Sequence, residues 1–299
     1  MNRSLFHLIA LAAPLHAAPL DPAQIPAAAK WLVHADIEAM RASETGKTVF
    51  TRIEADHGAQ LKAAKRMFSI NPIADLNGIT LFGDGKPEHA VALIHGNFDR
   101  AHLEELVAAA GDYSKDTYSG LTVHTWADKG SDQHAAFAND HLLVFSRQES
   151  LLHQALDTLK AGSPAGPDPF FAAEGGRPLI AGSANLADID LPGDEARLLR
   201  MAKSLHVAAN ENAGRFAIRI GAGTGDATHA DRLRRMLDGV IAFAQAGDPK
   251  LDGLDLQSSV AVTGDKTGLD ASVSLPVNEW VTLIQKAADE EAKKKDKKK

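Results

Sequence analysis

The chain has 299 residues, a formal net charge of −7 and no cysteine. The absence of cysteine excludes disulfides, thiolate nucleophiles and cysteine-ligated metals, so we expect stability to come from packing. The acidic balance argues against a nucleic-acid-binding surface on the folded body, because phosphate contacts need clustered Lys and Arg.

The first eighteen residues have the features of a secretory signal peptide. Arg3 stands in a short polar start, and an apolar run follows from Leu5 to Ala13. Small residues at Ala17 and Ala18 allow cleavage after either one. The run is shorter than the roughly 20 residues of a membrane-spanning helix, so we expect a periplasmic or secreted protein without a transmembrane segment after signal removal.

The pattern of the remaining sequence indicates two segments of similar size joined by a linker. Residues 161–178 are crowded with glycine and proline and lack helical or alternating periodicity, which is typical of a linker. We predict one lobe over residues 19–160, a second over 179–288, and a disordered lysine-rich tail over 289–299. The similar order of elements in the two lobes predicts an internal duplication.

Each lobe is predicted to open with a strand, a capping side chain and a helix. In the first lobe the strand covers 31–34 and Asp36 caps the helix; in the second, the strand begins at Pro178 and Asn185 takes the capping position. A hairpin follows, because short polar turns favour antiparallel neighbours over parallel crossovers. The predicted hairpin strands are 79–83 with 90–96 and 205–210 with 215–221.

A helix, a second pair of strands and a final helix complete each lobe. Asp99 is predicted to cap the helix after the first hairpin and Thr228 the helix after the second, and one additional helix is expected near 59–68. Helices that follow hairpins cover one face of a mostly antiparallel sheet, which predicts an α+β fold with one such sheet in each lobe. The later strand pairs are expected over 121–126 with 142–146 and over 256–263 with 269–275.

Thirteen histidines leave a metal site open as a hypothesis. His95 would end a strand, Asp99 would cap the next helix, and His102 would lie one turn into that helix. Such a corner can collect three ligands around zinc and leave the fourth position to water. The competing interpretation is structural, because Asp99 is already explained as a helix cap.

Other motifs do not predict a cofactor. The segment 221–227 follows a strand, but Asp226 occupies the position where a dinucleotide-binding loop needs glycine or alanine. His134 and His141 bracket a predicted hairpin, and their spacing alone does not decide whether they meet. We therefore expect no bound cofactor.

Two features point to interactions with partners. Phe170 and Phe171 lie inside the polar linker, where they would either anchor a partner or pin the linker against the lobes. The last eight residues hold six lysines and one aspartate, so the remainder of the chain carries −12. Such a tail would attract polyanions or anionic lipid, or else act as a solvated end that keeps the protein in solution.

The sequence therefore favours an exported, non-catalytic envelope protein that binds a partner or forms an assembly. One alternative is a metal-dependent hydrolase that uses His95, Asp99 and His102. Another is a protein held at a polyanion or membrane surface by its lysine-rich tail.

Overall fold

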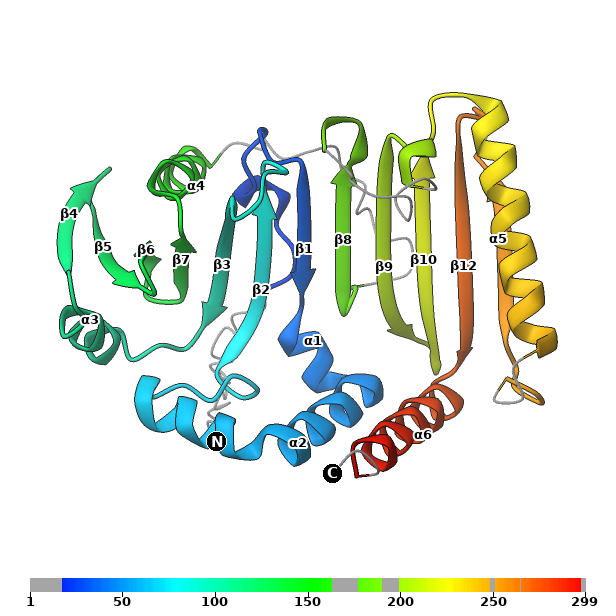
Figure 1. The fold of residues 1–299 in the computed structure, drawn as a ribbon, viewed down its shortest axis with the longest axis horizontal. Coiled ribbons are helices and arrows are strands. Elements are labelled where there is room, and N and C mark those ends of the chain that lie inside the picture. Colours follow the sequence, from blue (N-terminus) through cyan, green and yellow to red (C-terminus); the bar gives the residue numbers. More distant parts are fainter. Residues whose placement is uncertain (1–17, 163–176, 190–198, 248–250, 264, 297–299) are drawn as a thin grey trace, which may run out of the picture.

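The structure is a computed structural model that describes the chain apart from residues 1–17, 163–176, 190–198, 248–250, 264 and 297–299. Its centre is one sheet of twelve strands in the order β11-β12-β10-β9-β8-β1-β2-β3-β7-β6-β5-β4 (Figure 1). All neighbouring strands run antiparallel. The strands are β1 (Trp31–Ala35), β2 (Leu76–Gly83), β3 (Ala90–Gly96), β4 (Ser114–Tyr118), β5 (Leu121–Asp128), β6 (Ser131–Asn139), β7 (Leu142–Ser146), β8 (Ile180–Asn185), β9 (Ser204–Asn212), β10 (Arg215–Gly223), β11 (Gln257–Val262) and β12 (Gly268–Pro276).

The opening strands of the two halves pair with each other. β1 pairs with β2 on one side and with β8 on the other, so the prediction of a separate sheet for each lobe is wrong. The pairing satisfies backbone groups that two separate sheets would leave exposed at their edges. Both halves follow the same spatial order, β1-β2-β3-β7-β6 and β8-β9-β10-β12-β11. A shared strand order does not establish that the two halves have the same three-dimensional structure. The internal duplication and the lobe boundaries therefore stay predictions.

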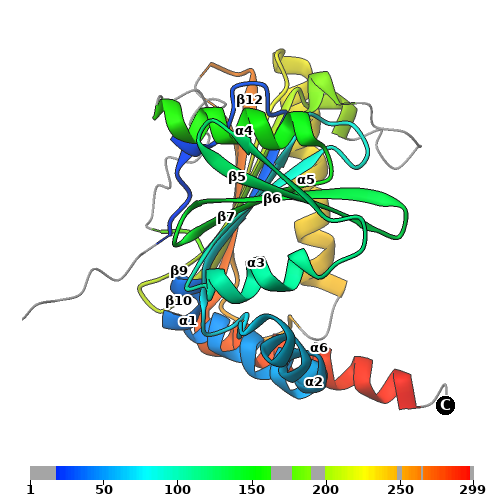
Figure 2. The ribbon, with the colours of Figure 1, turned by 90° about the vertical axis from the view of Figure 1, so that its left-hand side faces the viewer.

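Helices lie on both faces of the sheet, which corrects the prediction that they cover one face only. On one face, α4 contributes Leu156 to a core that also includes Leu93 and Val144 of the sheet. On the other face lie α3, α5 and α6, and Figure 2 shows α3 and α4 on opposite sides of the strands. Successive side chains of a strand point to opposite faces of the sheet. Because the strands of the first half carry apolar residues on both faces, helices can pack on either face. The helices are α1 (Ile37–Ala42), α2 (Glu44–Phe68), α3 (Arg100–Ala108), α4 (Glu149–Ala161), α5 (Ala227–Gly247) and α6 (Val277–Asp296).

Two of the predicted caps are confirmed at the atomic level. The Asp36 carboxylate accepts a hydrogen bond from the Ala39 backbone N–H at 2.9 Å and begins α1. The Asp99 carboxylate accepts one from the His102 backbone N–H at 3.1 Å and begins α3. A short polar side chain at each position satisfies a backbone donor that the helix itself leaves unpaired.

The second half departs from the predicted local structure in two places. A 3₁₀ turn over Leu186–Asp188 replaces the predicted helix after β8. Asp226, rather than Thr228, caps α5 by accepting a hydrogen bond from the His229 N–H at 2.8 Å. The cap therefore lies two residues before the predicted one, and the aspartate satisfies a backbone donor in the first turn of α5.

Further departures concern the number and length of elements. Four strands, β4 to β7, follow α3 where one pair was predicted, and the helix expected near 59–68 is the end of the 25-residue α2. α6 continues to Asp296, so the tail predicted to be disordered is helical up to that residue. Its run of Ala, Glu and Lys consists of strong helix formers, which explains the extension.

Candidate functional site

Helix α3 lies against the sheet without closing on it. The helix contributes no buried residue, although Leu103, Leu106 and Val107 are directed toward the strands. By contrast, α4 on the opposite face contributes three buried apolar residues. The apolar side of α3 therefore borders an open space instead of a packed core.

This space is an apolar cavity of about 410 Å³. It is bounded by α3, by the C-terminal end of α2, and by one face of β5, β6 and β7. Of the described residues that line it, all are apolar except His124 and Glu104. Cavities of this size and character hold small molecules. The lining includes Met67, Phe68, Ile70, Leu103, Leu106, Val107, Trp126, Ala135, Phe137, Leu143 and Phe145.

Polar contacts at its N-terminal end hold α3 in place. The His102 ring donates a hydrogen bond from Nε2 to the Met67 carbonyl oxygen at 2.8 Å, which ties α3 to the end of α2. Arg100 donates to the Glu104 carboxylate at 2.6 Å, and its guanidinium lies 5.3 Å from the centre of the Phe137 ring. The helix thus keeps its position through hydrogen bonds and a cation–π contact, and the cavity beside it stays open.

His124 supplies the buried polar group of the cavity lining. It lies on β5 with only 6% of its surface exposed. Its Nδ1 is hydrogen-bonded to the Tyr113 hydroxyl at 3.0 Å, but Nε2 has no hydrogen-bond partner among the described residues. The nearest carboxylate oxygen, on Glu104, is 3.8 Å from Nε2. Burial lowers the pKa of His124 below its usual value, against the opposing effect of Glu104, so the ring is neutral near pH 7.

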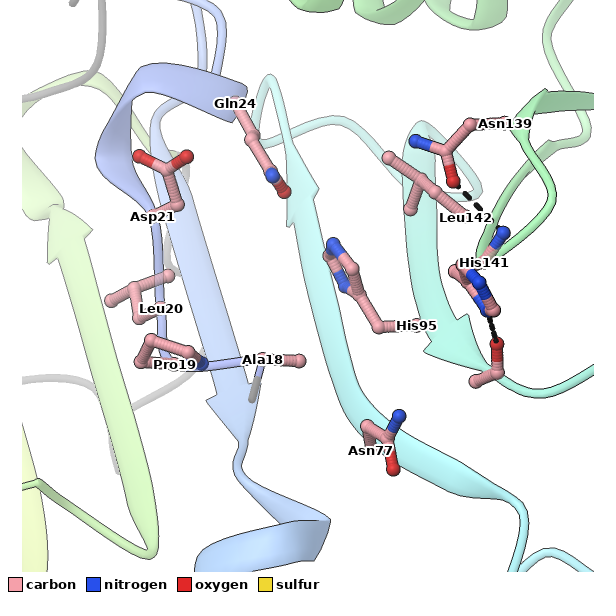
Figure 3. A pocket seen from close by; sticks show the side chains of 11 residues that line it. Ala18, Pro19, Leu20, Asp21, Gln24, Asn77, His95, Asn139, His141 and Leu142 are labelled. Carbon is pink, nitrogen blue, oxygen red and sulfur yellow. Dashed lines mark hydrogen bonds between the residues drawn. The ribbon is translucent and has the colours of Figure 1, made fainter. Parts of the chain in front are cut away.

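A second, polar pocket of about 700 Å³ lies on the opposite face of the sheet, at the end of β3 (Figure 3). His95 and His141 extend into it from β3 and from the turn before β7, and His141 Nδ1 lies 3.3 Å from the Gly96 carbonyl oxygen. Nδ1 of His95 is buried and has no partner in the described part of the chain. Burial lowers the pKa of His95, although Asp21 opposes this. The lining also includes Ala18, Pro19, Leu20, Gln24, Asn77, Asn139 and Leu142.

His34, on β1, is buried near this pocket. Its side chain is 1% exposed, and Nδ1 is hydrogen-bonded to the Thr80 hydroxyl at 2.9 Å. Its pKa is lowered to about 4, chiefly by burial and to a smaller extent by the nearby His95 and Arg177, while Asp36 opposes them. His34 is therefore a neutral core residue at pH 7.

The structure does not assemble the candidate metal ligands. His95 lines the polar pocket, whereas the Asp99 carboxylate caps α3 and His102 Nε2 is bonded to a backbone carbonyl. Within the described ranges, no three His, Cys, Asp or Glu side chains are close enough together to hold a metal ion. The competing structural interpretation accounts for Asp99 and His102.

The other predicted candidates lie elsewhere. His134 sits within β6 opposite Ser146, hydrogen-bonded to Thr125 at 3.0 Å, while His141 follows the end of β6, so the two do not meet. Phe170 and Phe171 lie outside the described residues.

Sequence reasoning missed the apolar cavity. Its buried histidine, His124, stands in the predicted strand 121–126, and nothing in the local sequence marks this residue as part of a site. A signal was present in the segment 142–146, whose consecutive apolar residues are typical of a strand covered on both faces. A strand of this kind needs a covering layer on each face of the sheet, and the helix that became α3 is one of the two layers that this reasoning would have predicted.

Fold and site define an α+β protein with one antiparallel sheet and an apolar cavity between that sheet and a helix. The fold resembles that of TP0453, whose crystal form III has a TM-score of 0.50 at 9% sequence identity, over 90% of this chain and 98% of that chain. Crystal forms I and IV both give a TM-score of 0.49, with 10% and 8% identity, over 89% of this chain and 97% of theirs. At such identities the likeness is one of fold alone.

No protein-family model and no curated protein matches the chain. Of the helices in the described ranges, none combines the length and the apolar character needed to cross a bilayer.

Proposed function

We propose that this chain is an exported, non-catalytic binding protein that holds a small apolar molecule in the cavity beside α3. The observation that carries the proposal is the contrast between a sheet face rich in large apolar side chains and a helix that buries none of its own against it. When a ligand covers the apolar surface left exposed in this arrangement, the removal of that surface from water favours binding.

The lining supports binding over catalysis. Among its described residues there is one imidazole and one carboxylate, and there is no serine, threonine, cysteine or lysine that would serve as a nucleophile. The two polar groups are 3.8 Å apart, too far for a hydrogen bond. Turnover of an envelope substrate by the purified, metal-stripped protein would contradict the non-catalytic part of the proposal.

Binding is tested directly by titrating the protein with butylbenzene in a calorimeter. We expect saturable binding and a higher melting temperature, since a ligand at 100 times its Kd stabilises the native state by about 2.7 kcal/mol. Leu106→Trp places a large ring in the cavity and should abolish the binding. Ala108→Trp adds the same ring at an exposed position of α3 and should leave it unchanged. Absence of saturable binding to the unmodified protein, or equal binding by both variants, refutes the proposal.

Export is a separate part of the proposal and has its own test. The polar start, the apolar run and the small residues at Ala17 and Ala18 support it. Mass spectrometry of the protein recovered outside the cytoplasm should find a chain that begins at residue 18 or 19. A chain that keeps its first eighteen residues contradicts export through a cleaved signal.

A further inference from the structure

We infer that the ligand of the apolar cavity carries one neutral hydroxyl group, which forms a hydrogen bond with Nε2 of His124. This inference rests on the proposed function, because it specifies the chemistry of the molecule that the cavity holds. The ligand is thus an amphiphile with a compact apolar body and one uncharged polar group.

His124 presents an unsatisfied nitrogen to the cavity. Its side chain is more than nine-tenths buried and lines the cavity, yet Nε2 has no hydrogen-bond partner among the residues described. A buried polar atom without a partner costs the protein desolvation free energy that a ligand group recovers by bonding to it. An entirely apolar ligand would leave this cost in place.

A hydroxyl group suits Nε2 of His124 whichever ring nitrogen carries the proton. The bond between the Tyr113 hydroxyl and Nδ1 of His124 is compatible with a proton on either ring nitrogen. Nε2 is therefore a donor in one tautomer and an acceptor in the other. A hydroxyl group both donates and accepts, so it pairs with Nε2 in either case.

The carboxylate of Glu104 disfavours an anionic head group at this place in the cavity. A carboxylate at Nε2 would lie next to Glu104, whose oxygen is 3.8 Å from that nitrogen. Arg100, the nearby cation, already donates to Glu104 and lies over the Phe137 ring. Like charges in an apolar surrounding repel strongly, so the site disfavours an anion.

Three probes with the same apolar body test the inference: butylbenzene, 4-butylphenol and 4-butylbenzoate. They are titrated into the unmodified protein, His124→Phe and His134→Phe. His134 is the matched control, because it is a buried histidine on the adjacent strand, hydrogen-bonded to one hydroxyl, and does not line the cavity. We expect the preference for the phenol over the hydrocarbon to fall about tenfold in His124→Phe and to stay unchanged in His134→Phe.

The outcomes separate the inference from the proposed function. If no probe binds, the proposed function fails. If butylbenzene and the phenol bind but His124→Phe leaves their ratio unchanged, or if the benzoate binds best, the hydroxyl inference fails and the cavity function stands. Should His124→Phe not fold, NMR of the imidazole nitrogens in the unmodified protein decides: the phenol must shift the Nε2 resonance of His124 more than butylbenzene does, and equal shifts overturn the inference.

Discussion

Replacing His34 with glutamine should remove part of the acid sensitivity of the folded protein. The pKa of His34 is about 4 in the folded state, against 6.5 for an exposed imidazole, because burial disfavours the charged ring. The unfolded chain therefore binds the proton at a higher pH than the folded one. The stability that comes from keeping His34 neutral is present above pH 6.5 and is lost as the pH falls toward 4. Linkage gives a loss of about 2 kcal/mol between pH 7.5 and pH 5.0 from this residue.

Urea unfolding at both pH values measures this loss. His34→Gln should lose about 2 kcal/mol less than the unmodified protein between pH 7.5 and pH 5.0, whatever its stability at the higher pH. His57→Gln, which removes an exposed histidine of α2, should lose as much as the unmodified protein. If His34→Gln shows the same loss as these two, then protonation of His34 is not the cause and the argument from burial is refuted.

Three further predictions concern packing, charge and the tail. Arg177→Met should lower the free energy of unfolding by about 3 kcal/mol, because it leaves the buried Asp36 carboxylate without its cation; adding Asp36→Asn should restore part of the loss, and additive losses in urea unfolding would contradict the pairing. Leu156→Ala, at a position of α4 that is 1% exposed and packs against the sheet, should cost about 3 kcal/mol with an unchanged urea m-value, and a loss below 1 kcal/mol would mean that the site collapses around the gap. Deleting Lys293–Lys299 should weaken sedimentation with anionic vesicles at low salt if the tail binds them, and unchanged binding would exclude the tail.

The local part of the fold was predictable from the sequence. Asp36 and Asp99 mark the starts of α1 and α3 because a carboxylate satisfies free backbone donors wherever a helix begins. The hairpins β2–β3, β9–β10 and β11–β12 follow from short turns between alternating or apolar strands. Such features depend on neighbours within a few residues, so no tertiary information is needed to find them.

The candidate site was not predictable in the same way. His124 and Leu106 are eighteen positions apart, and they border one cavity only because β5 and α3 are placed together by the order of the strands. The three residues proposed as metal ligands were grouped by closeness in sequence. In the structure, Asp99 and His102 serve α3 while His95 lines a pocket on the other face.

The α+β composition, the starts of α1 and α3 and the antiparallel hairpins follow from the amino-acid sequence alone, since each of these depends on side-chain period and turn chemistry within a short segment. Three features depend on tertiary contacts: β1 and β8 join the halves into one sheet, helices cover both faces, and α3 leaves a cavity. These features depend on which strands and helices that are distant in sequence pack together. The periodicity of a strand shows that its faces are apolar, but it does not specify which element will cover each face.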